Sequence, residues 1–171
     1  MEDQDLGGID KDRGHPRAIQ IIPDEFFWDC TDELSPFGSD EGDTALSEYR
    51  DWRKENPDEA LDECLVWTIE SVGEIDASEY TDAIFDEKTV RGQINDPDFD
   101  DQQLIYTTDV SVIATAFGQL ADEGKIDASA KPYVSRALKR QMVWGKLQPD
   151  WGHAEAYLKN LARLQAALAE A

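Results

Sequence analysis

Cysteine and histidine are scarce in this sequence, which contains two of each in 171 residues. Cys30 and Cys64 are expected to be two reduced thiols in or near the core, because nothing else in the sequence indicates an oxidising compartment. Zinc sites draw at least two ligands from one local motif. The two cysteines and the two histidines, His15 and His153, form no such short-spaced pair. The sequence therefore predicts no zinc site.

Motifs that carry catalysis are also missing. The chain has no Gly-x-Ser-x-Gly, no phosphate-binding glycine loop and no dinucleotide fingerprint, so we expect no catalytic residue and no cofactor. Two acidic runs resemble calcium loops without matching them. Phe37 occupies the first ligand position of one run, and residues 96–101 lack the required Gly and Glu. A weak Ca²⁺ or Mg²⁺ site in these turns stays open, with no residue named as a metal ligand.

Long hydrophobic runs are absent. The longest uncharged stretch, residues 110–121, is too short to span a bilayer and contains polar residues. Residues 1–14 are acidic and lack the apolar core of a secretory signal. These features favour a cytoplasmic location without a membrane segment.

Positive charge is scarce and unevenly placed. The net charge is −22, and residues 1–110 hold 32 acidic against 8 basic residues, whereas residues 111–171 hold 6 against 8. Such a chain repels nucleic acid and anionic membranes, so neither is an expected partner. The expected partner is a basic protein surface. Divalent cations, no partner at all, or adaptation to high salt are the alternatives.

What the sequence does contain is helical periodicity. Apolar residues recur three and four positions apart, between Asp, Ser, Asn and Pro starts and Gly stops. The pattern predicts an all-α fold, a single-domain bundle of about six helices over residues 15–171, preceded by a flexible acidic arm over residues 1–14. The helices are expected within residues 43–56, 57–73, 76–90, 101–123, 127–145 and 150–171. Residues 16–22 are expected to form a helical turn, with a short strand as the alternative.

A six-residue pattern occurs twice. Residues 73–78 read Gly-Glu-Ile-Asp-Ala-Ser and residues 124–129 read Gly-Lys-Ile-Asp-Ala-Ser. Each copy lies where a helix is expected to end at glycine and the next to be capped by Asp or Ser. One turn chemistry used twice is the preferred interpretation, and a duplicated helical hairpin is the alternative.

Residues 24–43 form the strongest candidate for a functional surface, because aromatic residues alternate there with carboxylates. Such a mixture can anchor a partner by its rings and attract a cationic surface by its charge. The structural alternative is a loop whose aromatic residues are pinned to the core. The candidate partner-binding residues are Trp28, Asp29, Asp32, Glu33, Phe37, Asp40, Glu41 and Asp43. A basic patch at Arg136, Lys139 and Arg140 either docks an acidic group or neutralises the chain's own acids.

The runs His15-Pro16, Phe26–Asp29, Ser35–Asp40 and Tyr49–Trp52 resemble the YfeS-like group of bacterial proteins over about residues 15–73. Some members of that group carry names linked to WGR domains or molybdate regulation. This chain contains no Trp-Gly-Arg triplet. The resemblance implies a bacterial cytoplasmic origin, and the group brings no established activity with it.

Together these features predict a non-catalytic protein that binds another protein, as an immunity-type inhibitor or a regulatory partner of a basic protein. Two alternatives belong to other classes. One is a divalent-metal-dependent enzyme that uses surface carboxylates, and the other is a DNA mimic with carboxylates spaced like phosphates.

Overall fold

Seven α-helices make up most of the computed structural model, which describes residues 8–148 and 150–171. No strand occurs among these residues, so the predicted all-α class is confirmed. The helices are α1 (Pro16–Ile21), α2 (Asp40–Glu55), α3 (Leu61–Gly73), α4 (Glu87–Asn95), α5 (Thr108–Glu123), α6 (Lys131–Lys146) and α7 (Ala154–Glu170). The short 3-10 turns are η1 (Lys11–Arg13), η2 (Glu25–Trp28), η3 (Ala77–Glu79) and η4 (Asp82–Phe85).

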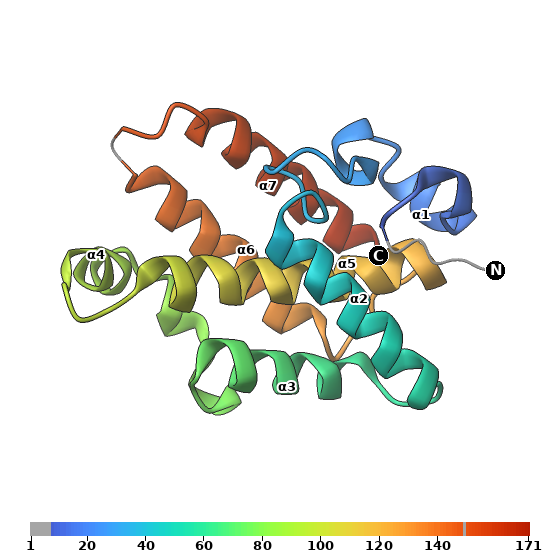
Figure 1. The fold of residues 1–171 in the computed structure, drawn as a ribbon, viewed down its shortest axis with the longest axis horizontal. Coiled ribbons are helices and arrows are strands. Elements are labelled where there is room, and N and C mark those ends of the chain that lie inside the picture. Colours follow the sequence, from blue (N-terminus) through green and yellow to red (C-terminus); the bar gives the residue numbers. More distant parts are fainter. Residues whose placement is uncertain (1–7, 149) are drawn as a thin grey trace.

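Helix α5 is the centre of the fold. It runs through the middle of the molecule, with α2 and α3 on one side and α6 on another, while α7 packs on α6 (Figure 1). Every residue from Thr108 to Ala121 is buried. Other elements therefore surround this helix on all sides, and it has no solvent-exposed polar face opposite its apolar stripe. The stretch Gln102–Glu123 is long and apolar enough to cross a membrane, yet 83% of its most apolar window is buried inside the molecule, as in a core helix.

The aromatic residues of the 24–43 segment belong to the core, as the structural alternative expected. Phe27 and Phe37 are fully buried and Trp28 is 8% exposed. The ring of Phe27 packs edge-on against Trp28, Phe37 and Phe117, with centroids 5.0, 5.3 and 5.8 Å away. The segment is therefore attached to α5 by edge-to-face contacts between aromatic rings, which are among the largest contributors of buried apolar area in any core.

Residues 8–14, the second half of the arm expected over residues 1–14, pack against the rest of the protein. Ile9 is 6% exposed and joins the main core, and the Arg50 guanidinium donates to the carbonyl of Gly8. The Lys11 ammonium donates to the Pro23 carbonyl over 2.8 Å. A buried Ile9 corrects the expectation of a loose arm over residues 8–14, while residues 1–7 lie outside the described residues.

Several helix starts differ from the sequence expectation. Helix α2 begins at Asp40, before the predicted start at Asp43, because the Ser39 hydroxyl accepts the Gly42 amide over 3.1 Å. Helix α3 begins at Leu61 rather than Pro57. Its first amide is capped by the carboxylate of Asp127, which lies 66 positions away and accepts the Leu61 N–H over 2.9 Å. Asp127 or Ser129 was expected to cap α6, whose cap residue is Ala130 instead.

The secondary structure predicted from the sequence is least accurate for residues 76–101. Asp76 caps η3, as expected, but the helix predicted within 76–90 is replaced by the turns η3 and η4. Helix α4 then begins at Glu87, after the Asp86 cap, and continues to Asn95, through residues expected to be irregular. Asp86 competes with Asp76 as a start signal, and both carboxylates accept a nearby backbone amide.

The two copies of the repeated pattern end their helices differently. Gly124 itself takes the left-handed conformation after α5, with φ 79°. At the first copy Gly73 is still helical, and Glu74 takes the left-handed position with φ 57°. Both helices therefore end at a left-handed residue, but its position in the repeated pattern differs by one residue between the two copies.

Replacing Glu74 with glycine is expected to stabilise the protein by about 1 kcal/mol, because a side chain in the left-handed region costs about 1–2 kcal/mol and glycine avoids this. Urea unfolding followed by circular dichroism measures the change. Glu79→Gly, in the 3-10 turn that follows, is the control and should not stabilise. A loss of stability in Glu74→Gly would show that the Glu74 side chain contributes more than its backbone strain costs.

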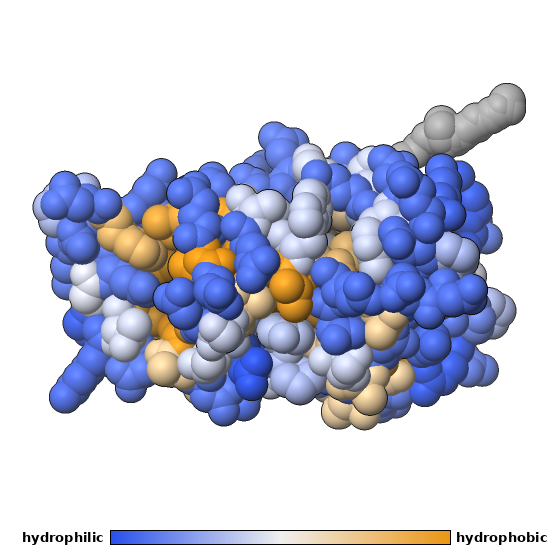
Figure 2. Space-filling model, turned by 90° about the horizontal axis from the view of Figure 1, so that it is seen from below, coloured by the Kyte–Doolittle hydropathy of each residue, from blue (hydrophilic) through white to orange (hydrophobic). Residues whose placement is uncertain are grey.

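The face formed by α3 is drawn in Figure 2 and mixes apolar residues with many hydrophilic ones. Trp67 on α3 is the only large hydrophobic side chain among the described residues that is exposed, at 52%. A single exposed ring is ordinary for a protein surface. It provides a control position for the experiments below.

Candidate functional site

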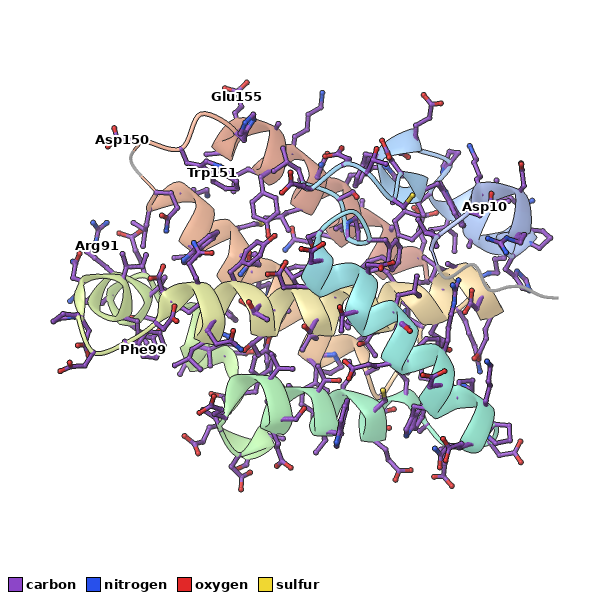
Figure 3. All side chains as sticks on the ribbon, in the orientation of Figure 1. Asp10, Arg91, Phe99, Asp150, Trp151 and Glu155 are labelled. Atoms are coloured by element: carbon purple, nitrogen blue, oxygen red, sulfur yellow. The ribbon has the colours of Figure 1, made fainter. Side chains whose placement is uncertain are left out.

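A cleft of about 1010 Å³ lies where the 31–41 segment faces the start of the long central helix and the connection between α6 and α7. Figure 3 shows that connection, with Asp150 at its outer turn and Trp151 beside the start of α7. The cleft is large enough for a side chain together with part of a peptide backbone. It is lined by Thr31, Asp32, Glu33, Leu34, Gly38, Ser39, Asp40, Glu41, Gln102, Tyr106, Trp144, Gln148, Asp150, Trp151, His153 and Tyr157.

One wall of the cleft is acidic. Asp32 and Glu33 lie on a tight loop, and Asp40 and Glu41 lie in the first turn of α2. The Asp32 carboxylate accepts the Leu34 amide over 2.9 Å, and the positive end of the α2 dipole favours negative charge at Asp40 and Glu41. Among the described residues, none of these four carboxylates forms an ion pair. Their charge is therefore available to a cationic ligand.

The loop that carries these carboxylates closes very tightly at Gly38. A Cβ atom added there would lie 1.8 Å from the carbonyl oxygen of Asp32. The Ser35 hydroxyl also donates to the carbonyls of Asp29 and Asp32, over 3.0 and 2.7 Å. The position of the acidic wall is thus built into the backbone of the loop.

The opposite wall is a row of four aromatic rings. Tyr106 lies 5.5 Å from Trp144, Trp144 lies 6.1 Å from Trp151, and Trp151 lies 5.3 Å from Tyr157, measured between centroids. Tyr106 and Trp151 are half-buried, whereas Trp144 and Tyr157 are buried. Tyr106 and Trp151 therefore present the ring surface that a ligand can contact.

Tyr106, the first ring of the aromatic wall, lies on a segment with unusual backbone geometry. Residues Gln102–Thr107 (η5) form a π-helix, a geometry that is rare and frequently found at functional sites. Its widened turn places both Gln102 and Tyr106 on the cleft. Two of its carbonyls accept side-chain donors from α6, with Arg140 donating to Leu104 and Gln141 to Ile105, each over 3.4 Å.

Beneath the aromatic wall lies a buried polar network. The Tyr157 hydroxyl donates to Gln141, and the Gln141 amide donates to Asp109 over 3.0 Å. Asp109 is fully buried and also accepts two bonds of 2.8 Å from the Arg140 guanidinium and one from the Tyr80 hydroxyl. Burial raises the pKa of both Tyr80 and Tyr157 well above the usual value, so both hydroxyls stay protonated and act as donors.

Tyr106 on the aromatic wall lines the same cleft as Glu33 and Glu41 on the acidic wall. Burial raises the pKa of the Tyr106 hydroxyl, the negative charge of Glu41 raises it further, a hydrogen bond with Ser39 lowers it, and the charge of Glu33 raises it again. A cation between the walls would therefore meet an aromatic surface and carboxylates at the same time.

Four of the eight candidate partner-binding residues line this cleft, namely Asp32, Glu33, Asp40 and Glu41. Trp28 and Phe37 are both buried. Trp28 donates its indole N–H to the Ile22 carbonyl over 2.9 Å, and Phe37 is fully buried. The expectation that these two rings anchor a partner is corrected by their place in the core.

The remaining two candidates, Asp29 and Asp43, lie outside the residues that line the cleft. Asp29 binds the hydroxyl and amide of Thr31, which lower the pKa of its carboxyl, so its charge mainly organises the loop. Sequence reasoning missed the aromatic wall. Trp144 and Tyr157 lie within the helices expected at residues 127–145 and 150–171, but nothing in the sequence placed them, or Trp151, at a cleft.

The basic patch of α6 serves the chain itself. Arg136 binds Asp82, Arg140 binds Asp109, and the Lys139 ammonium lies 5.3 Å from the centroid of the Phe85 ring. The two arginine pairs fit the alternative in which the patch neutralises the chain's own acids. Cys30 is exposed and Cys64 is buried, and both are free thiols. Within the described ranges, no group of three or more His, Cys, Asp or Glu residues is arranged to hold a metal ion.

Comparisons with known proteins support a distant relationship. The chain is 29% identical over 157 residues to a protein of Escherichia coli (strain K12) called "Uncharacterized protein YfeS". The match covers 91% of this chain and 60% of the relative, so this chain spans about 60% of that protein's length. No protein-family model and no solved structure matches the chain. The YfeS-like relationship predicted from residues 15–73 is confirmed as a weak one that extends over most of the chain.

Proposed function

We propose that this chain is a non-catalytic binding protein of the bacterial cytoplasm that holds a basic segment of another protein in the cleft. The observation behind the proposal is that four carboxylates without a basic partner among the described residues face a row of aromatic rings. Carboxylates attract a cationic partner and exclude an anionic one. Aromatic rings supply the apolar burial from which most binding energy comes.

The charge balance of the whole molecule supports the same partner. Four of the eight basic residues in 111–171 pair with the chain's own acids, among them Arg163 with Asp24 and Arg136 with Asp82. The net charge nevertheless remains −22. Its field extends about 8–10 Å at physiological salt and raises the rate at which basic partners arrive.

An immunity-type inhibitor that covers a basic nuclease, or a regulatory partner of a basic protein, is the specific form that we propose. A concave acidic site favours a partner that inserts a segment. A DNA mimic would instead need carboxylates spaced like phosphates along one face. The four carboxylates here are gathered within residues 32–41 on one wall of a cleft, which supports the inserted segment over the mimic.

The proposal predicts that neutralising the four cleft carboxylates weakens the binding of a basic peptide. In the variant Asp32→Asn/Glu33→Gln/Asp40→Asn/Glu41→Gln, we expect the dissociation constant for capped hexalysine to rise about tenfold or more. Each exposed ion pair contributes about 0.2–1 kcal/mol, and about 1.4 kcal/mol corresponds to a factor of ten. Isothermal titration calorimetry at about 50 and 300 mM salt measures the loss, which should be larger at low salt.

A matched control removes the same charge elsewhere. Glu55→Gln/Asp58→Asn/Glu59→Gln/Glu63→Gln neutralises four exposed carboxylates around the α2–α3 connection. This control should change the dissociation constant less than about threefold, because it alters only the long-range field. Equal losses in the two variants would contradict a specific site, and the absence of hexalysine binding by the unchanged protein would remove the proposal.

A further inference from the structure

Three arginines of this chain share one arrangement. Each guanidinium lies over an aromatic ring and at the same time contacts a carboxylate. Arg53 lies 5.0 Å from the Trp52 centroid and 2.9 Å from Glu123. Arg140 lies 5.4 Å from the Tyr80 centroid and 2.8 Å from Asp109.

The third case, Arg136, lies 5.8 Å from the Tyr133 centroid and 3.0 Å from the Asp82 carboxylate. The chemistry explains the repetition. A guanidinium is planar and weakly hydrated, so its face stacks on a ring while its edge donates in parallel to a carboxylate. A lysine ammonium is a strongly hydrated point charge, so it interacts less favourably with the face of an aromatic ring.

The cleft supplies the same two walls without an arginine of its own. No Lys or Arg is among the residues that line it. Tyr106 and Trp151 present half-buried rings, and the charges of Glu41 and Glu33 act on the Tyr106 hydroxyl. The site therefore has the ring and the carboxylates of the internal arrangement and lacks only the guanidinium between them.

A second group in the cleft calls for a different ligand atom. The side-chain amide nitrogen of Gln148 is buried and has no hydrogen-bond acceptor in the described part of the chain. Such a donor costs about 1–3 kcal/mol when it stays unpaired. A backbone carbonyl of a peptide is the acceptor that an inserted segment brings with it.

We infer that the cleft recognises an arginine side chain on an extended segment of the partner protein. The guanidinium stacks against the half-buried rings of Tyr106 and Trp151 and pairs with the acidic wall at Glu33 and Glu41. A carbonyl of the same segment accepts the free amide of Gln148. This inference rests on the proposed function and adds to it the residue type that the cleft selects.

The experiment compares capped hexaarginine with capped hexalysine at equal ionic strength, using isothermal titration calorimetry. Hexaarginine is expected to bind at least about fivefold more tightly, because cation–π stacking favours the guanidinium. Trp151→Leu should weaken hexaarginine binding about 3- to 30-fold and abolish the preference over hexalysine. Trp67→Leu, which removes the exposed ring on α3, is the matched control and should keep the preference.

A spectroscopic readout on the unchanged protein covers the case in which Trp151→Leu fails to fold. In a ¹⁵N–¹H correlation spectrum, hexaarginine should shift the indole signals of Trp151 and Trp144 and leave that of Trp67 in place. The two leucine variants, where folded, and Trp144→Phe assign these signals. Arginine amide, the free form of the same cation, should bind at least about tenfold more weakly than hexaarginine, because it lacks the segment.

The outcomes separate this inference from the proposed function. Equal affinity for the two peptides, with the loss in the cleft carboxylate variant retained, would overturn the arginine preference and leave the proposed function standing. No binding of either peptide would overturn both. Arginine amide that binds as tightly as hexaarginine would show that the cleft takes a small molecule rather than a protein segment, and would also overturn the inference.

Discussion

Arg140→Met is expected to lower the free energy of unfolding by about 3–5 kcal/mol. The substitution removes the guanidinium that makes two hydrogen bonds of 2.8 Å to Asp109, whose side chain is fully buried. A buried carboxylate that loses its counter-charge is left with the full cost of its desolvation. The donors that remain, Tyr80 and Gln141, are neutral and do not replace a positive charge.

Urea unfolding followed by circular dichroism measures the loss, and Arg136→Met is the matched control. Arg136 lies one turn earlier on α6 and pairs with Asp82, a side chain that is 80% exposed. Exposed pairs contribute about 0–1 kcal/mol, so the control should lose far less. The double variant Asp109→Asn/Arg140→Met should recover part of the loss, because no buried charge remains. Similar losses in the two single variants would mean that water or another cation reaches Asp109.

This network connects the stability of the core with the shape of the cleft. Asp109 and the π-helix belong to the same continuous helix, and the Asp109 partners Arg140 and Gln141 also donate to carbonyls inside the π-helix. Gln141 is further bonded to Tyr157 on the aromatic wall. A polar network that is fully satisfied rigidifies its surroundings. The buried charges thus hold Tyr106 and Tyr157 in the row that faces the acidic wall.

The part of the fold that could be predicted from sequence is the part fixed by local chemistry. The end of α5 follows from Gly124, and the buried stripes of α5 and α7 follow from their apolar spacing. The start of α3 does not, because its cap is an aspartate 66 positions away. Rules for helix caps consider only neighbouring residues, so they assigned Asp127 to the next helix.

For a similar reason, only the acidic wall of the candidate site could be predicted from the sequence. The acidic wall comes from one short segment, where the density of carboxylates is evident. The aromatic wall collects rings from the central helix, α6 and the start of α7, and only the fold brings these together. Trp144 and Tyr157 lie in helices whose positions the sequence predicts, but no periodicity reveals that a buried helix face borders a cleft. The π-helix that turns Tyr106 toward it has no local sequence signal either.

Phe37 provides the sharpest test of how the acidic segment works. The sequence offered two roles for this ring, a contact with the partner and an anchor in the core. The structure places it in the core, where it is fully buried and packs edge-on against Phe27 with centroids 5.3 Å apart. Phe37→Ala is therefore expected to lower the free energy of unfolding by about 3–5 kcal/mol, the usual effect of deleting a buried phenyl ring.

The effect should extend to the cleft, because Phe37 lies between Glu33 and Asp40 on the segment that carries the acidic wall. Where Phe37→Ala remains folded, we expect hexaarginine to bind more weakly, since the loop loses the ring that fixes it to Phe27. Trp67→Ala removes a larger but exposed ring and should cost less than about 1 kcal/mol, with binding unchanged. Urea unfolding and titration calorimetry on the same samples separate the two roles. A variant that binds weakly but unfolds at the same urea concentration as the unchanged protein would make Phe37 a partner contact, and the core position described here would be wrong.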